Sequence, residues 1–326
     1  MAAHGTEIAT SVDRGGFLPV AVDTLCPTAV LDFDLYLRPD PEAPPSLYRE
    51  SMYPLEQEDL DRLAERGVQT LYIPSGKCVA YQRYLREVVL ANRNLTPVQR
   101  FAILKRANRA VFQSAFRSSN LDHMVRFADE FGQQMSEVIC NRDLVLVDLF
   151  SLMDHDYYTY THVTNVCTYC VALANWMDGF PSSDLVTIAV GALLHDIGKR
   201  HVPPGVLNNP DRLTSRQREL VRQHAQAGFE ELCLRDDLCW GQLMMVYQHH
   251  ERLNGHGYPV GLTSEEIHPW ARICSIADVF DALSSERPYR KPDQVDDVLK
   301  FLRRRAGNEF DREMVQCWVA MMRGKS

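Results

Sequence analysis

The chain has 326 residues, of which 45% are hydrophobic and 24% are charged, a composition typical of a globular protein with about two domains. Its formal net charge of -8 argues against binding to a nucleic-acid polymer, which needs a basic surface, but allows a small anion held through metal ions. The N-terminus lacks the apolar core of a secretory signal, and the longest apolar run, Leu185–Leu194, is too short to span a bilayer. We therefore expect a cytoplasmic protein with no membrane span and with reduced cysteines.

The first 90 residues indicate a small α+β module. Its expected elements, in order, are β-like runs at Phe17–Val22 and Leu31–Leu37, a Pro-rich loop at Arg38–Pro45, a helix near Leu55–Arg66 stopped by Gly67, and a strand at Val68–Ile73. No cluster of His, Cys or carboxylate residues in this segment indicates chemistry. We predict that residues 1–90 form an accessory module of unknown role.

Residues 91–143 are predicted to form a helical connector. Thr96 followed by Pro97 is typical of a helix N-cap with Pro at the first helical position. Apolar residues then recur at helical spacing, at Phe101, Leu104, Ala107, Val111, Phe112 and Phe116. A connecting segment is the favoured interpretation, and a coupling element or a homodimer surface is the alternative.

Residues 144–326 are mostly helical and contain nearly every residue of chemical interest. Cys167 and Cys170 form a C-x-x-C pair, but they lie in a helical pattern with no βαβ context and no second pair. We interpret them as buried core thiols. The predicted fold class is therefore mainly α, a helical bundle domain preceded by the small α+β module.

Histidine and aspartate residues recur at interior-looking positions of the apolar helices in this last segment. They are His162, the pair His195 and Asp196, His224, the pair His249 and His250, and Asp278. Any one of them alone would indicate a core residue with its own hydrogen-bond partner, but buried ionisable groups are costly unless paired or metal-bound. Imidazole with carboxylate suits divalent iron, manganese, nickel or zinc, and helices can present such ligands around one bundle core.

Five motifs, in this order, resemble the HD-GYP group of the HD superfamily of metal-dependent phosphohydrolases. They are HDIGK at residues 195–199, HHERLNGHGYP at 249–259, ARI at 271–273, ADVFDAL at 277–283 and RPYR at 287–290. The resemblance covers about residues 145–310. It implies that residues 144–326 form an HD-type helical catalytic bundle that hydrolyses the bacterial second messenger cyclic di-GMP.

The resemblance also implies a metal-binding role for each candidate. One metal ion would be bound by His162, His195, Asp196 and Asp278, and Asp196 would bridge to a second ion held by His224, His249 and His250. Some members of the group carry a Glu four residues before the first His, which helps to bind a third ion. Because that position is Tyr158 here, we expect two ions, iron or manganese first and nickel or zinc as alternatives.

Further residues match the substrate side of the group's site. Lys199 would reach the phosphate as a catalytic and substrate-binding residue, and Tyr258, Arg287 and Arg290 would hold the substrate. Gly255 and Gly257 would let the loop backbone turn tightly. Asn254, which stands where Asp is frequent, is not at a ligand position, and His201, His256 and His268 are expected on loops or at the surface.

The predicted function is hydrolysis of cyclic di-GMP to pGpG, with slower onward cleavage to GMP. Two ions that share a carboxylate acidify a water, neutralise phosphoryl oxygens and orient in-line attack. One alternative is a signalling module that binds cyclic di-GMP or a partner with weak turnover, which the complete ligand set argues against. Another is a different HD-type phosphohydrolase or a diiron oxygenase, which the GYP loop and the RPYR run argue against. The expected partners are cyclic di-GMP and other signalling proteins that contact the GYP loop.

Overall fold

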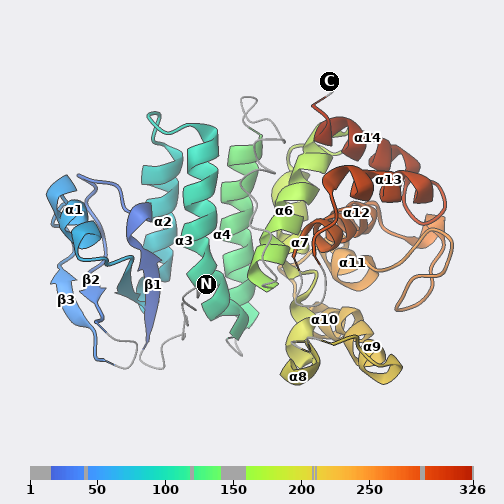
Figure 1. Cartoon of the computed structure of the whole chain (residues 1–326), viewed down its shortest axis with the longest axis horizontal. Coiled ribbons are helices and arrows are strands. Elements are labelled where there is room, and N and C mark those ends of the chain that lie inside the picture. Colours follow the sequence, from blue (N-terminus) through green and yellow to red (C-terminus); the bar gives the residue numbers. More distant parts are fainter. Residues whose placement is uncertain are drawn as a thin grey trace, which may run out of the picture. The chain divides into compact units, whose positions relative to one another are not determined.

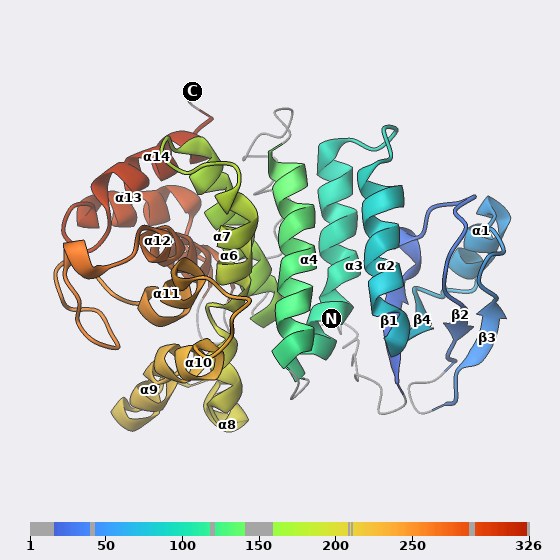
Figure 2. The same ribbon diagram turned by 180° about the vertical axis from the view of Figure 1, so that it is seen from behind.

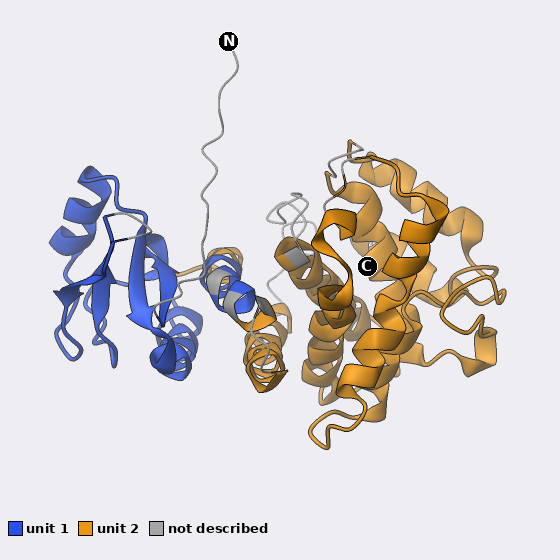
Figure 3. Ribbon diagram, turned by 90° about the horizontal axis from the view of Figure 1, so that it is seen from below, with its two compact units in different colours: residues 1–94, 103–114 blue, residues 95–102, 115–326 orange. Residues whose placement is uncertain are grey.

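The computed structural model describes residues 16–39, 43–117, 121–140, 159–207, 209, 211–286 and 291–324. The chain divides into two compact units, shown in Figure 3. Unit 1 comprises residues 1–94 and 103–114, and unit 2 comprises residues 95–102 and 115–326. Both units contribute to one long helix, α3 (Pro97–Arg117), which begins at the predicted cap. Thr96 Oγ1 accepts a hydrogen bond from the Gln99 backbone N–H, and the Gln99 side chain accepts one from the Thr96 N–H.

Unit 1 is built on an antiparallel sheet of the order β1-β4-β2-β3. Its elements are β1 (Phe17–Ala21), β2 (Leu35–Leu37), β3 (Ser46–Arg49), α1 (Gln57–Glu65), β4 (Thr70–Pro74) and α2 (Cys78–Tyr84), which continues as a π-helical turn over Leu85–Leu90. The predicted α+β character is confirmed. The predicted strand at 31–37 is shorter than expected, and β3 was not predicted, because the Pro-rich run before it indicated only a loop.

Local signals explain the boundaries of α1. Glu56 and Asp59 form a reciprocal capping box at its start, and Gly67 follows its end with a φ of 69°. Asp59, although buried, forms ion pairs with Arg49 of β3 and Arg62 of α1. The pair with Arg49 connects the helix to β3 at the edge of the sheet.

Apart from two isolated β-bridges, the regular secondary structure in the described residues of unit 2 is helical. Its helices are α4 (Leu121–Ile139), α6 (Thr159–Trp176), α7 (Asp184–Leu194), α8 (Pro204–Leu207), α9 (Ser215–Arg222), α10 (His224–Leu232), α11 (Trp240–Gln248), α12 (Pro269–Ser284), α13 (Val295–Arg305) and α14 (Arg312–Met322). The apolar helix α7 packs against α4, α6 and α11, and α12 packs against α6 and α11 (Figures 1 and 2). The predicted mainly helical fold is confirmed.

The apolar runs of unit 2 are core segments. Residues 188–194 of α7 are all buried, as are Cys167 and Cys170 of α6. All nine cysteines of the chain are free thiols, as expected. Among the described residues, no helix combines the length and the apolar character needed to cross a membrane.

A close backbone approach joins the end of α7 to α10. A short 3-10 turn, η4 (Ile197–His201), follows α7 and packs against α10. A Cβ added at Gly198 would lie 2.0 Å from the His224 carbonyl oxygen and 2.5 Å from the Gly228 nitrogen. Only glycine fits between these segments, and its small size lets the chain after His195 meet the start of α10.

We expect Gly198→Ala to lower the free energy of unfolding by about 1–3 kcal/mol, because the added methyl group must push η4 away from α10. Thermal and urea unfolding measure the change. Gly205→Ala is the matched control, since a Cβ there meets nothing within 4 Å. Equal stabilities of the two variants would show that the close approach is not a constraint.

Candidate metal centre

Five histidines and two aspartates converge inside unit 2, and they are the seven residues singled out as metal ligands. His162 lies on α6, His195 and Asp196 follow α7, His224 begins α10, His249 and His250 follow α11, and Asp278 lies on α12. Their potential ligand atoms form two groups, each with all its atoms within 4.8 Å of one another. One group is Asp196, His224, His249 and His250, and the other is His162, His195 and Asp278.

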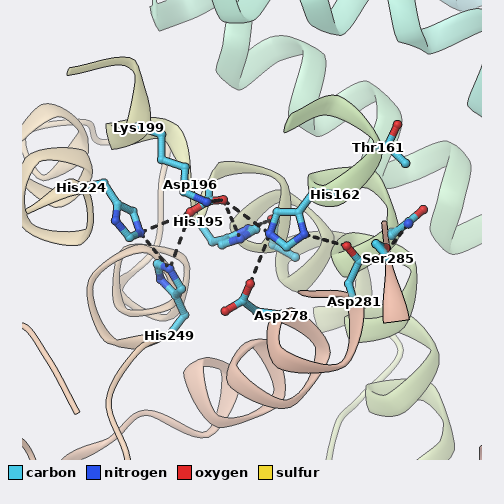
Figure 4. Close-up of polar contacts among 12 residues, drawn as sticks. Thr161, His162, His195, Asp196, Lys199, His224, His249, Asp278, Asp281 and Ser285 are labelled. Atoms are coloured by element: carbon cyan, nitrogen blue, oxygen red, sulfur yellow. Dashed lines mark hydrogen bonds and ion pairs between the residues drawn. The ribbon is translucent and has the colours of Figure 1, made fainter. Parts of the chain in front are cut away.

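Asp196 lies between the two groups, as Figure 4 shows. Its Oδ1 is 3.3 Å from His224 Nε2 and 3.9 Å from His249 Nε2. Its Oδ2 is 3.5 Å from Nε2 of both His162 and His195. The two oxygens of one carboxylate, only 1% exposed, thus face different sets of imidazoles.

Asp278 closes the opposite side of the cluster. Its Oδ1 lies 3.2 Å from His162 Nε2, and its Oδ2 lies 3.6 Å from His250 Nδ1. Burial alone would raise the pKa of this carboxyl group, but the hydrogen bond from His162 and the neighbouring His250 hold it well below its usual value. For Asp196, Lys199 and His195 likewise overcome the effect of burial. Both side chains are therefore ionised, as metal ligands must be.

His195, His224 and His249 turn their Nε2 atoms toward the centre. Nδ1 lies 2.6 Å from the Ala192 carbonyl oxygen in His195, and 2.6 Å from the Val221 carbonyl oxygen in His224. His249 Nδ1 lies 3.0 Å from the carbonyl oxygens of Met245 and Val246. Since a carbonyl oxygen only accepts, Nδ1 carries the proton, and Nε2 of the neutral ring has the free lone pair.

This arrangement of lone pairs fits a bound cation. His224 Nε2 and His249 Nε2 are 3.2 Å apart, so two lone pairs face each other. Among the described residues, the buried atoms His195 Nε2 and Asp196 Oδ1 have no hydrogen-bond partner. Burial and the neighbouring imidazoles lower the pKa of His249 and of His250, which keeps these rings neutral. Cations held by the two groups would satisfy these atoms.

His162 differs from the other histidines because its Nδ1 faces a second carboxylate. Asp281 Oδ2 lies 2.7 Å from this nitrogen, and Asp281 Oδ1 accepts a hydrogen bond from Asn165 Nδ2 at 2.8 Å. Burial alone would lower the pKa of His162, but the hydrogen bonds to Asp278 and Asp281 raise it to about 9. A carboxylate behind a ligand histidine fixes the ring and increases its basicity.

Sequence reasoning did not assign a role to Asp281. A signal was present, since Asp281 lies three residues after Asp278, and residues at this spacing share one face of a helix. Asp281 is 1% exposed, so its carboxylate needs the partners that α6 supplies.

A second buried carboxylate without an assigned role, Glu251, orders the loop after α11. Its side chain accepts hydrogen bonds from three consecutive backbone N–H groups, those of Val260, Gly261 and Leu262, at 2.8–3.1 Å. Gly255 has a φ of 75°, as expected for a tight turn. A Cβ at Gly257 would lie 2.4 Å from the Glu251 Cα, so this loop folds closely onto the end of α11.

The loop places Tyr258 beside the cluster. The rings of Tyr258 and His250 are stacked, with centroids 4.6 Å apart. Within the cluster, Lys199 Nζ donates a hydrogen bond to Asp196 Oδ2. Of the proposed substrate contacts, Arg287 and Arg290 lie outside the described residues, as does Tyr158.

The other histidines among the described residues lie outside both groups. His201 is exposed and hydrogen-bonded to Glu231, and His256 is exposed. His268 is half-buried and caps α12 by accepting a hydrogen bond from the Trp270 N–H.

A hollow of about 430 Å³ lies elsewhere in unit 2, along α13 and α14. Its lining consists of Arg303, Ala306, Arg312, Val315, Gln316, Val319, Ala320 and Arg323. None of these residues belongs to the His/Asp cluster, so the convergence of ligand atoms, and not the size of a cavity, locates the candidate site.

Comparison with known proteins agrees with this geometry. Residues 155–314 match the HD domain family. A cyclic di-GMP phosphodiesterase of Pseudomonas aeruginosa is 29% identical over 282 residues, which are 81% of this chain and 67% of the relative. A 3'3'-cGAMP-specific phosphodiesterase of Vibrio cholerae is 34% identical over 164 residues, 50% of this chain and 35% of that relative. The chain thus spans about a third of the second relative's length.

A solved structure of an HDG"Y"P protein from Bdellovibrio bacteriovorus has the same fold. It aligns with a TM-score of 0.65 and 20% identity, covering 94% of this chain and 100% of that one. A helical unit whose His and Asp residues converge in this way fits a metal-binding domain of the HD type. Residues 155–314 of the chain match the HD domain family, and its five motifs resemble those of the HD-GYP group.

We expect Asp281→Asn to weaken the binding of Mn²⁺ by about 10–100-fold, because the amide no longer provides the charged acceptor that orients His162. Titration against a competing chelator measures the affinity. Asp297→Asn is the control, since Asp297 is exposed and its side chain bonds only Lys300 among the described residues. If Asp281→Asn binds Mn²⁺ as tightly as this control, the carboxylate does not support the ligand.

Proposed function

We propose that the cluster binds two divalent metal ions bridged by Asp196. His162, His195, Asp196 and Asp278 would hold the first ion, and Asp196, His224, His249 and His250 the second. The observation that carries this proposal is the position of Asp196, whose two oxygens face different imidazole sets. The mixed imidazole and carboxylate ligands favour iron or manganese, with nickel and zinc as alternatives.

The residues of the site suit phosphodiester hydrolysis. When bound, the ions supply positive charge for the phosphoryl oxygens and lower the pKa of the attacking water. Lys199, whose side chain is 26% exposed, can turn its ammonium group from Asp196 toward an equatorial oxygen of the phosphate. Tyr258 forms a rigid wall beside His250, because Glu251 fixes the loop that carries it.

We propose cyclic di-GMP as the substrate and pGpG as the first product, with GMP from slower onward hydrolysis. The five motifs and the similarity to the phosphodiesterase of P. aeruginosa support this choice. The similarity to the 3'3'-cGAMP-specific enzyme of V. cholerae makes that mixed dinucleotide the second candidate. Both substrates contain two phosphodiester bonds and differ in one base.

Turnover assays on metal-loaded protein test the function. Cyclic di-GMP, 3'3'-cGAMP, a nucleoside triphosphate and bis(4-nitrophenyl) phosphate are compared, and cyclic di-GMP is expected to give the highest kcat/KM. A preference for 3'3'-cGAMP would show that the mixed dinucleotide is the substrate. A preference for the triphosphate would show that the enzyme is not a phosphodiesterase. Binding of cyclic di-GMP without turnover would establish the signalling module instead.

We expect Asp196→Asn to lower the metal content from about two ions per chain and to reduce turnover about a thousandfold or more, because loss of the shared anion removes several kcal/mol of stabilisation. Elemental analysis and the cyclic di-GMP assay measure the two effects. Asp236→Asn, at an exposed position before α11, should change neither. Near-normal metal content and turnover in Asp196→Asn would rule out the bridge, and three tightly held ions in the wild type would contradict the metal count.

A further inference from the structure

An exposed arginine stands at the rim of the metal centre. Arg222 is the last residue of α9 and lies two residues before His224. Its guanidinium carbon is 5.2 Å from the centroid of the Tyr258 ring. Among the described residues, no carboxylate forms an ion pair with it, although the chain as a whole has a net charge of -8.

Two successive contacts connect Arg222 to the metal cluster through the ring of Tyr258. Tyr258 lies on His250 with an angle of 28° between the rings, and Arg222 lies over Tyr258. His250 belongs to the ligand group of Asp196, so the positive charge of Arg222 stands one ring away from the cluster. Glu251 holds residues 260–262 of the loop, and the Tyr258 N–H donates a hydrogen bond to the His250 carbonyl oxygen at 3.3 Å. The ring over which the guanidinium lies is therefore held against His250.

The contact with Tyr258 leaves the hydrogen-bonding capacity of Arg222 available. A guanidinium has five N–H donors, and a ring face uses none of them fully. A charge-assisted, bidentate bond to a phosphate is stronger than a cation–π contact at an exposed site. An anion arriving beside Tyr258 would therefore engage Arg222 in preference to the ring.

We propose that Arg222 is a specificity-determining residue that binds the second, uncleaved phosphate of a cyclic dinucleotide while the first phosphate is at the metal centre. The inference rests on the proposed function and adds a residue to the substrate contacts that the motifs imply. It explains how a site that cleaves one phosphodiester bond distinguishes a cyclic dinucleotide from a simple diester, which has no second phosphate. The Arg222 fork matches the paired oxygens of that phosphate.

Substitutions at Arg222 separate its charge from its packing. Arg222→Met keeps an unbranched side chain against Tyr258 and removes the charge, and Arg222→Lys keeps the charge without the fork. Arg216→Met is the matched control, because Arg216 is exposed on the same helix. The assays compare cyclic di-GMP with bis(4-nitrophenyl) phosphate on metal-loaded protein, and elemental analysis checks that each variant retains its metal.

We expect Arg222→Met to lower kcat/KM for cyclic di-GMP about tenfold, mainly through KM, and to leave the aryl diester within about twofold of the wild type. Arg222→Lys should lie between these values, and Arg216→Met should match the wild type on both substrates. An equal loss on both substrates would assign Arg222 to packing of Tyr258. An unchanged KM for cyclic di-GMP would remove Arg222 from the substrate contacts.

Failure of the proposed function is visible separately, in the wild type. If the wild type prefers 3'3'-cGAMP, the same comparison is made with that substrate, which also has two phosphates. If it hydrolyses no cyclic dinucleotide, the proposed function fails, and the affinity of metal-loaded protein for cyclic di-GMP then decides the role of Arg222. Binding that is about tenfold weaker in Arg222→Met supports the contact, and equal or undetectable binding overturns it.

Discussion

The carboxylate of Asp196 is the group on which the architecture of unit 2 depends. A buried anion is strongly unfavourable unless cations or hydrogen-bond donors surround it, and Asp196 is 1% exposed. Its compensation comes from side chains on separate elements, among them His162 of α6 and Lys199 of η4. The ends of these elements must therefore converge on one point, and glycine at position 198 permits the closest of the approaches. The close packing at Gly198 and the buried charge of Asp196 therefore both require η4 to lie against α10.

The ligand tautomers are set locally, one helix at a time. Three of the histidines donate Nδ1–H to a carbonyl three residues earlier, and these carbonyls lie in or beside a final helical turn, where backbone acceptors lack partners within the helix. A histidine at a helix end therefore satisfies an orphan carbonyl and aims Nε2 away from the helix. His162 lies inside α6, where the backbone carbonyls are already paired, and it needs Asp281 for the same purpose. The acceptor behind His162 is a charged carboxylate, whereas the acceptors behind the other three rings are neutral carbonyl oxygens. His162 is therefore the most basic imidazole whose pKa shift is resolved.

The sequence predicted what depends on local pattern. The apolar run of α7, the cap at Thr96, the stop at Gly67 and the seven clustered His and Asp residues were all visible as spacing and residue type. The functions of Asp281 and Glu251 were not, because their value depends on partners that only the fold supplies. Asp281 meets His162 across 119 residues of sequence, and no periodicity encodes such a pair. The short strand β3 was missed for a similar reason, since its pairing with β2 outweighs a weak local signal. The metal count, the bridge and the substrate contacts stay predictions.

The hydrogen bonds between Glu251 and the loop after α11 affect which surface residues of that loop can be substituted. Among the described residues, its carboxylate bonds main-chain N–H groups, those of residues 260–262. These hydrogen bonds do not depend on the side chain at position 260, whereas position 261 favours glycine because its φ is 84°. Val260 accordingly points 57% of its surface into solvent while its backbone is held. The side chain at position 260 can therefore change in hydrophobicity or charge without moving Tyr258 from His250. Main-chain hydrogen bonds on the inner side of the loop thus leave a surface position open to substitution while the site beneath is preserved.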